Sequence, residues 1–239
     1  MAKPLALPGA LRATLAAHAD PARAAPMQAY MKSAMPFLGI EAPLRRRLAG
    51  AVAAAYPVAD AAMLLDSVLL LWRTATYREE RYGALDLLRM ARHRKLVDLS
   101  FLPAVQEMIV TGPWWDHNDE ISGQPLCLLL QRHPAQVKPV LREWARSDSL
   151  WLRRAAMLCQ RRINEGFDAV LLYECILPST GHGAMAQEFF IRKGMGWALR
   201  ERSYAAPEEV QAFCAEYRDQ LSALTRREAL KVIQRSRLA

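Results

Sequence analysis

An indole and a carboxylate stand four residues apart at Trp115 and Asp119. If this segment is helical, the two side chains share one face, where a lone carboxylate among cations would stabilise developing positive charge. Trp197 supplies a second indole, and it follows Gly194 and Gly196, which allow a backbone or a ligand to approach the helix closely. Two indoles and a carboxylate can surround a cation. The competing interpretation is a solvated or capping Asp beside a core indole, which is the commoner case.

Arg154 is the residue that best suits a phosphate. It falls on the same helical stripe as Leu150, Trp151 and Leu158, so we expect its stem to be partly packed while its guanidinium reaches outward. The planar fork of N–H groups can bind two phosphate oxygens at once. Other basic runs could extend a phosphate track, but we interpret each first as a solvated helix end. These runs are Arg45–Arg47, Arg92–Lys95, Arg161–Arg162 and Arg226–Arg227.

The overall charge favours a polyanionic partner. The 239 residues include 32 Lys and Arg against 24 Asp and Glu, a formal net charge of +8, and the pI is near 9.6. This balance favours nucleic acid over acidic small molecules, although many basic proteins bind no anion. The sequence contains no P-loop, GxGxxG, GxSxG or HExxH motif. That argues against nucleotide hydrolysis, dinucleotide cofactors, serine hydrolases and zinc peptidases.

The four cysteines are far apart in apolar helical patterns, without a CxxC pair or a histidine at ligand spacing. They are Cys127, Cys159, Cys175 and Cys214. The pattern indicates buried thiols in a reducing compartment. The N-terminal stretch contains prolines and lacks the continuous apolar core of a signal peptide, and no run approaches the roughly 18 apolar residues of a membrane span. We therefore expect a cytoplasmic protein.

Apolar residues recur at helical spacing along almost the whole chain, and no stretch shows a convincing strand alternation. Proline or a capping residue marks several expected helix starts. These lie at Glu41–Pro43, Gly112–Pro113, His133–Pro134, Ser147–Ser149, Ala206–Pro207 and Leu224–Thr225. The sequence predicts an all-α protein of about a dozen helices with short connections, organised as a single domain over 1–239.

A weak internal repeat emerges when helices that carry an aromatic, a basic and then small residues are superimposed. The overlay places Arg81, Arg154 and Lys193 in register, with Asp119 in the slot between the first two. The steps of 38, 35 and 39 residues match the period of roughly 40 residues in HEAT or armadillo arrays. We expect a solenoid, an α-α superhelix, whose concave basic face these four residues line. Chance could also produce such an overlay in an arginine-rich helical protein.

Several motifs follow one another in a defined order over most of the chain. They are Met27–Lys32 with Pro36–Ile40, Tyr77–Tyr82, Trp114–Asp116 with Asp119, Trp151–Ala156, Glu188–Ile191, Gly196–Glu201 and Arg226–Ala229. Together these motifs resemble the DNA alkylation repair family, the AlkD-type HEAT-like repeat DNA glycosylases. A series of motifs in order is far more specific than any one of them.

The resemblance implies roles for individual residues. Trp115, Asp119 and Trp197 would surround the deoxyribose of a damaged nucleotide, and Arg154 would support the site at the DNA backbone. Tyr30 and Phe190 match positions that would line or buttress it. To these DNA contacts we add Lys193 and Arg81, because the overlay places both in register with Arg154. We call the four residues Arg81, Asp119, Arg154 and Lys193 the predicted column.

The implied activity is hydrolysis of the N-glycosidic bond of cationic alkylated purines, N3-methyladenine and N7-methylguanine, in double-stranded DNA. The lesion would be held by its sugar and backbone, so a tight pocket for a flipped base is not needed. We expect a monomer, and the resemblance implies no metal, cofactor or Schiff-base lysine. Such a monofunctional enzyme of base excision repair would leave an abasic site without cutting the strand.

Two features depart from the family pattern, and two other functions stay open. His117–Asn118 and an extended loop at Pro178–Gly183 could shift substrate preference. One alternative function is a protein of the same fold that binds branched or distorted DNA without catalysis, although retention of the candidate residues speaks against it. The other is a helical-repeat scaffold that binds an acidic protein segment, for which a basic groove would suffice.

Overall fold

Helices account for all the regular structure of residues 6–163 and 165–236, which are the residues that the computed structural model describes. The all-α fold class is therefore confirmed. The chain divides into two compact units, Met1–Ala104 and Val105–Ala239, with the boundary inside helix α7 (Leu102–Thr111). The single domain over 1–239 and the concave basic face stay predictions.

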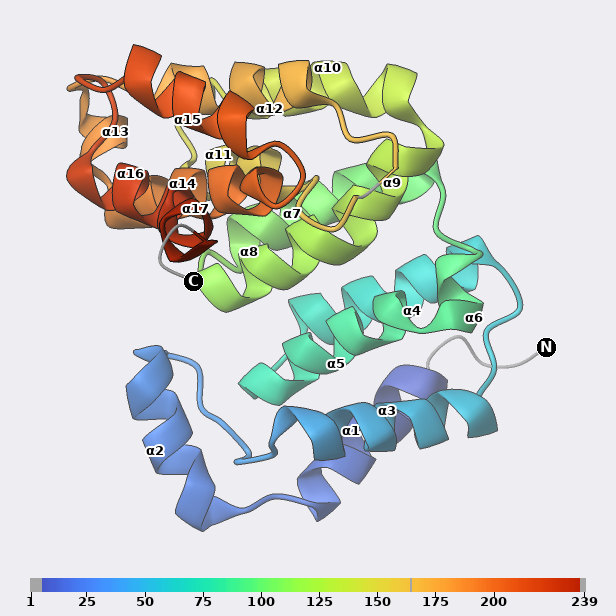
Figure 1. Cartoon of the computed structure of the whole chain (residues 1–239). Coiled ribbons are helices and arrows are strands. Elements are labelled where there is room, and N and C mark those ends of the chain that lie inside the picture. The colour runs from blue at the N-terminus through green and yellow to red at the C-terminus, as the bar shows by residue number, and fades with distance from the viewer. Residues whose placement is uncertain (1–5, 164, 237–239) are drawn as a thin grey trace. The chain divides into compact units, whose positions relative to one another are not determined.

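In the first unit, helices α1, α3, α4 and α5 pack against one another (Figure 1). Leu11, Leu64, Trp72 and Leu87 are fully buried in this unit, and burial of such apolar side chains drives the packing. The helices are α1 (Ala6–Ala17), α2 (Pro21–Met31), α3 (Ala42–Ala55), α4 (Ala61–Arg73), α5 (Arg78–Arg89) and α6 (Ala91–Arg94), followed by the 3-10 turn η1 (Leu99–Phe101).

A buried carboxylate holds the segment between α2 and α3. Glu79, near the start of α5, accepts hydrogen bonds from three consecutive backbone N–H groups of Leu38–Ile40, at 2.9, 2.9 and 3.1 Å. Gly39 has a φ of +84°, and a Cβ there would overlap the Asp20 carbonyl, so a side chain is excluded. The contact thus joins two motifs that are separate in the sequence, Pro36–Ile40 and Tyr77–Tyr82.

In the second unit, α11 is central and packs against α8, α10, α12 and α14, while α14 also packs along α16. The elements are α8 (Trp115–Ile121), the π-helical turn η2 (Ser122–Leu126), α9 (Cys127–Arg132), α10 (Pro134–Trp144), α11 (Leu150–Leu158), α12 (Ala169–Ile176), the 3-10 turn η3 (Leu177–Ser179), α13 (Ala184–Gln187), α14 (Phe189–Ser203), α15 (Pro207–Glu216), α16 (Ala223–Ala229) and α17 (Lys231–Ser236). Figure 1 shows α14 and α16 side by side.

Several helix starts follow the predicted signals. Pro134 and Pro207 are the first residues of α10 and α15, where the missing N–H has no intrahelical partner to lose. Ser149 caps α11 by accepting the Leu152 N–H. The start of α16 lies slightly earlier than expected, because Ser222 is the capping residue.

The four residues of the predicted column lie at matching points of four helices. Arg81 is in α5, Asp119 in α8, Arg154 in α11 and Lys193 in α14, each about one turn after the helix start. Within the second unit, α11 contacts both α8 and α14. The overlay thus identified corresponding helices, while the assignment to HEAT repeats stays a prediction.

All four cysteines are free and buried, as the sequence predicted. Burial raises the pKa of Cys175 to about 12 and that of Cys214 to about 11, so these thiols are poor nucleophiles at neutral pH.

Among the described residues, no cluster of His, Cys, Asp or Glu could hold a metal ion. Within the same residues, none of the helices has the length and apolar character to cross a membrane.

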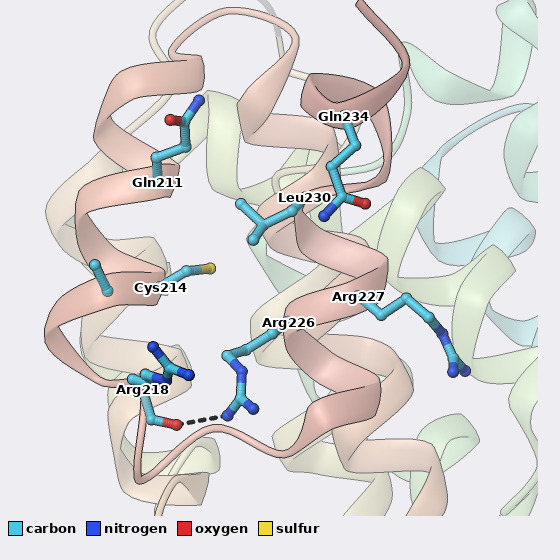
Figure 2. Close-up of a pocket in the computed structure, with 8 residues that line it drawn as sticks. Gln211, Cys214, Arg218, Arg226, Arg227, Leu230 and Gln234 are labelled. Atoms are coloured by element: carbon cyan, nitrogen blue, oxygen red, sulfur yellow. Dashed lines mark hydrogen bonds between the residues drawn. The ribbon is translucent and has the colours of Figure 1, made fainter. Parts of the chain in front are cut away.

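A pocket lies between α15 and the C-terminal helices, lined in part by Cys214, Arg218, Arg226 and Arg227. Figure 2 shows the Arg226 guanidinium directed at the end of α15, where Nη1 donates to the Arg218 carbonyl at 2.6 Å. Arg226 is half-buried, whereas Arg227 is exposed. Of these two arginines, only Arg227 therefore fits the expectation of a solvated residue.

Candidate active site

A bidentate ion pair between Asp119 of α8 and Arg154 of α11 joins the two helices. Arg154 Nε donates to Oδ1 of Asp119 at 2.9 Å, and Nη2 donates to Oδ2 at 3.0 Å. Both side chains are largely buried, with 5% of Arg154 and 14% of Asp119 exposed. This parallel geometry fixes the plane of the carboxylate as well as neutralising its charge.

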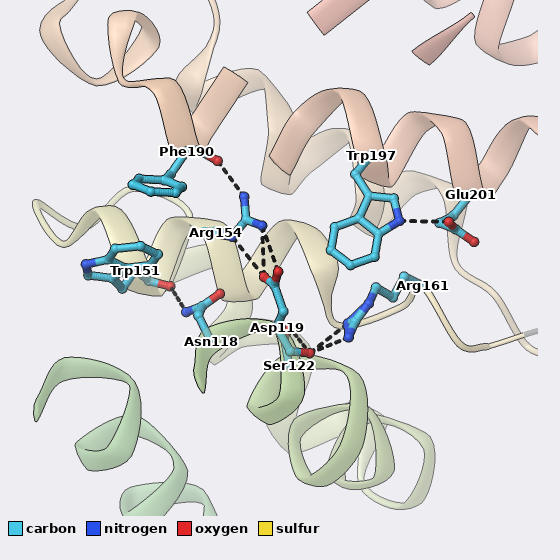
Figure 3. A network of polar contacts seen from close by, with 9 residues as sticks. All are labelled: Asn118, Asp119, Ser122, Trp151, Arg154, Arg161, Phe190, Trp197 and Glu201. Carbon is cyan, nitrogen blue, oxygen red and sulfur yellow. Dashed lines mark hydrogen bonds and ion pairs between the residues drawn. The ribbon is translucent and has the colours of Figure 1, made fainter. Parts of the chain in front are cut away.

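The same guanidinium also reaches α14, because Arg154 Nη1 donates to the carbonyl of Phe190 at 2.6 Å (Figure 3). Gly194 makes room for it: a Cβ there would lie 3.1 Å from Arg154 Nη1. The expectation that this guanidinium reaches outward is therefore wrong. The physical reason is that α8 and α14 both pack against α11 and present oxygen acceptors to the buried donor.

Trp197 presents its indole from α14 beside a second arginine. Its Nε1 donates to Glu201 at 2.7 Å, and the guanidinium carbon of Arg161 lies 4.7 Å from its ring centroid. Gly196, the residue before Trp197, lets α16 approach, because a Cβ there would lie 2.9 Å from the Thr225 carbonyl. The sequence predicts that either a backbone or a ligand approaches the helix here, and the structure shows the backbone of α16.

Arg161 also contacts the backbone at Asp119. Its Nη1 donates to the Asp119 carbonyl at 2.8 Å, and Nη2 contacts the same oxygen. The sequence placed this arginine among solvated helix ends, which is wrong. Gly123 and Pro125, just after Asp119, were the available signals, since both residues disturb a regular helix.

An aromatic cluster borders the ion pair. The rings of Trp114, Trp151 and Phe190 lie 5.1 to 6.2 Å apart, centroid to centroid. Phe190 thus contacts this cluster with its ring and Arg154 with its carbonyl. Trp115 is the first residue of α8, one turn before Asp119, and is half-buried. Of the two adjacent indoles, it is Trp114 that joins the cluster.

The other predicted DNA contacts are Lys193, Tyr30 and Arg81. Lys193 is 41% exposed and pairs with Glu228 of α16 at 3.0 Å. In the first unit, Tyr30 is 78% exposed on α2, and Arg81 stacks 4.8 Å from the ring of Trp72. The structure therefore brings together Asp119, Arg154, Trp197 and Phe190 within the second unit.

The charge state of Asp119 reflects opposing effects. Burial raises the pKa of its carboxyl above the usual range, while Arg154 and Arg161 act in the opposite direction and Asp116 adds to the increase. Burial also lowers the pKa of Arg161. The two arginines thus offset part of the cost of placing a carboxylate in a poorly solvated site, and burial remains the larger effect.

Both departures from the family pattern are structural features of the second unit. His117 and Asn118 are buried, and Asn118 Nδ2 donates to the Trp151 carbonyl at 2.7 Å. The segment Pro178–Gly183 begins in η3 and leads into α13, and the Pro178 carbonyl accepts a hydrogen bond from Arg153 at 2.9 Å. An effect of His117 and Asn118 on substrate preference would therefore act through packing, whereas His182 and Gly183 of the loop are exposed.

Comparisons with known proteins agree with this architecture. A family model described as DNA alkylation repair enzyme matches residues 11–233. No curated protein matches the chain. Among solved structures, the chain is similar to one described as a predicted DNA alkylation repair enzyme from Enterococcus faecalis, with 28% identity, a TM-score of 0.74, and coverage of 89% of this chain and 95% of the other. It also shares its fold with AlkD2 from Streptococcus mutans, at 18% identity and a TM-score of 0.55, covering 80% and 90% of the two chains.

Proposed function

This chain belongs to the family of DNA alkylation repair enzymes, and we propose that it is a DNA glycosylase. It hydrolyses the N-glycosidic bond of N3-methyladenine and N7-methylguanine in double-stranded DNA. The observation that carries the proposal is the carboxylate of Asp119, buried, oriented by Arg154 and connected through Arg161 to Trp197. The net charge of +8 supports DNA as the partner.

Alkylation at N3 or N7 gives the purine a formal positive charge, so the glycosidic bond is already weakened. The base leaves as a neutral molecule with the electron pair of that bond, and no strong general acid is required. The sugar approaches an oxocarbenium ion, and water then adds to its anomeric carbon and loses a proton. The products are the free base and an abasic site, with the strand intact.

Asp119 offsets the positive charge that develops on the sugar. Each carboxylate oxygen accepts one hydrogen bond from Arg154 and retains acceptor capacity, so the orienting contacts need not break. Because the site is poorly solvated, the charge interaction is stronger than in bulk water. The indole faces of Trp115 and Trp197 add a smaller attraction for the cationic sugar.

Arg154 acts mainly on Asp119 in this proposal, since its guanidinium is buried and already has protein acceptors. Two of its N–H groups remain for a DNA phosphate that reaches the site. Lys193, Arg81, Tyr30 and Phe190 complete the DNA contacts that we propose.

Single-turnover base release tests the function. Excess protein is mixed with a duplex that contains one N7-methylguanine, and the free base is quantified by chromatography against a no-enzyme reaction. We expect release that greatly exceeds spontaneous depurination, no release from the matched undamaged duplex, and strand breaks only after alkali. Tight binding to distorted DNA with no release would instead support the non-catalytic alternative, and the absence of DNA binding would support the protein scaffold.

A further inference from the structure

Arg161 is the one described side chain with recorded contacts to both Asp119 and Trp197. It donates to the Asp119 carbonyl from one edge of the guanidinium, and the guanidinium lies over the indole of Trp197. Asp119 and Trp197 come from different helices, α8 and α14. The arginine therefore connects the two groups that must meet one sugar.

The local backbone around Asp119 is built to receive this arginine. The helix widens into the π-helical turn η2 directly after α8, with Pro125 inside that turn. Pro125 has no N–H to donate and its ring crowds the preceding turn, and single π turns of this kind are frequent at functional sites. In this turn the Asp119 carbonyl accepts from the Ser122 hydroxyl at 3.3 Å as well as from Arg161.

Gly123 provides the space for the guanidinium. A Cβ built at this residue would overlap Arg161, including its guanidinium carbon at 2.6 Å. Because the residue lies in the turn between Asp119 and Pro125, the absence of a side chain there and the position of Arg161 are two parts of one arrangement.

We propose that Arg161 is a positioning residue that sets the orientation of Asp119 and Trp197 relative to each other. This inference rests on the proposed glycosylase function and deepens it. Since the guanidinium already covers one face of the indole, the sugar meets the opposite face or the ring edge. Arg161 thus determines from which side Trp197 approaches the reacting carbon.

Two different variants disturb this arrangement. Arg161→Met keeps the length of the side chain and removes its charge and donors, whereas Gly123→Ala retains Arg161 and displaces it. We expect each to lower the single-turnover rate constant roughly 10- to 100-fold, because small misplacement of reacting groups is costly, with DNA affinity changed far less. The double variant should be little slower than Arg161→Met alone, since both changes remove the same contact.

Arg146→Ala is the charge-matched control. Its side chain is exposed and its Nη1 donates only to the Arg142 carbonyl, so loss of one positive charge there should leave the rate constant unchanged. Additive losses in the double variant, or an equal loss in Arg146→Ala, would overturn the proposal and show a general charge or packing effect. The Gly123→Ala variant keeps the test decisive if Arg161→Met does not fold.

A second readout does not depend on catalysis. The indole N–H signal of Trp197, assigned with Trp197→Phe, should shift in the NMR spectra of Arg161→Met and Gly123→Ala and stay in place in Arg146→Ala. If the wild-type protein releases no methylated base, the function fails while these spectra still test the positioning. An unchanged indole signal in both variants would refute the positioning role even if catalysis is observed.

Discussion

Arg154 holds Asp119 through both carboxylate oxygens, at 2.9 and 3.0 Å, and the pair is almost entirely buried. A carboxylate that is already oriented needs little rearrangement when positive charge develops nearby.

Replacement of Asp119 by Asn should abolish the charge effect while keeping the shape of the side chain. We expect release of N7-methylguanine to slow by roughly 10²-fold or more, with most DNA affinity and the helical circular dichroism spectrum retained. Single-turnover base release is the measurement. If the variant releases the base as fast as the wild type, Asp119 has no catalytic role. A sample of the variant purified in the same way also shows whether a contaminating enzyme contributes to the release.

The two indoles should contribute less than the carboxylate. Trp115→Ala and Trp197→Ala are each expected to slow base release by roughly 2- to 30-fold, which corresponds to about 0.5 to 2 kcal/mol of cation–π attraction. Thermal unfolding must be measured in parallel, since Trp197 also packs against the core of the second unit. A loss in either variant as large as that of Asp119→Asn would show that the ranking is wrong.

Breaking the ion pair from one side should destabilise the fold. Arg154→Met leaves the Asp119 carboxylate buried without its main partner, at an expected cost of about 3 to 5 kcal/mol in the free energy of unfolding. Adding Asp119→Asn removes the uncompensated charge, so the double variant should be more stable than Arg154→Met alone. Urea unfolding of the four proteins measures this coupling, and strictly additive losses would argue against a buried pair.

Base release should depend on pH through Asp119. Burial raises the pKa of this carboxyl, so its charged form is lost at a higher pH than in an ordinary Asp, for which the pKa is about 3.9. The rate should therefore fall as the pH decreases through this raised pKa, while the protein remains folded by circular dichroism. A rate that stays constant down to the ordinary value would contradict the assignment.

DNA binding should weaken steeply with salt. Phosphate contacts release counterions, so the logarithm of the association constant falls linearly with the logarithm of the salt concentration. Lys193→Gln should reduce that slope by about 1 if its ammonium leaves Glu228 for a phosphate. Fluorescence anisotropy with an undamaged duplex gives the slope, and a flat response would favour the scaffold function instead.

Local pattern was sufficient for part of this protein. Helical spacing of apolar residues and the proline and serine helix starts depend on neighbouring residues only, so the all-α fold followed from the sequence. The overlay of Arg81, Asp119, Arg154 and Lys193 identified corresponding points on four helices for the same reason. Family motifs singled out Asp119 and Trp197 as candidate site residues.

Tertiary packing alone decided where these side chains point. Spacing within one helix tells which residues share a face, but it does not tell which neighbouring helix covers that face. For this reason the sequence directed Arg154 outward, whereas α8 and α14 enclose it and supply its acceptors. Gly123 and Pro125 indicate only that the helix is disturbed after Asp119. They do not predict the partner Arg161, whose contact with the Asp119 carbonyl spans 42 residues and depends on the widened turn of the folded chain.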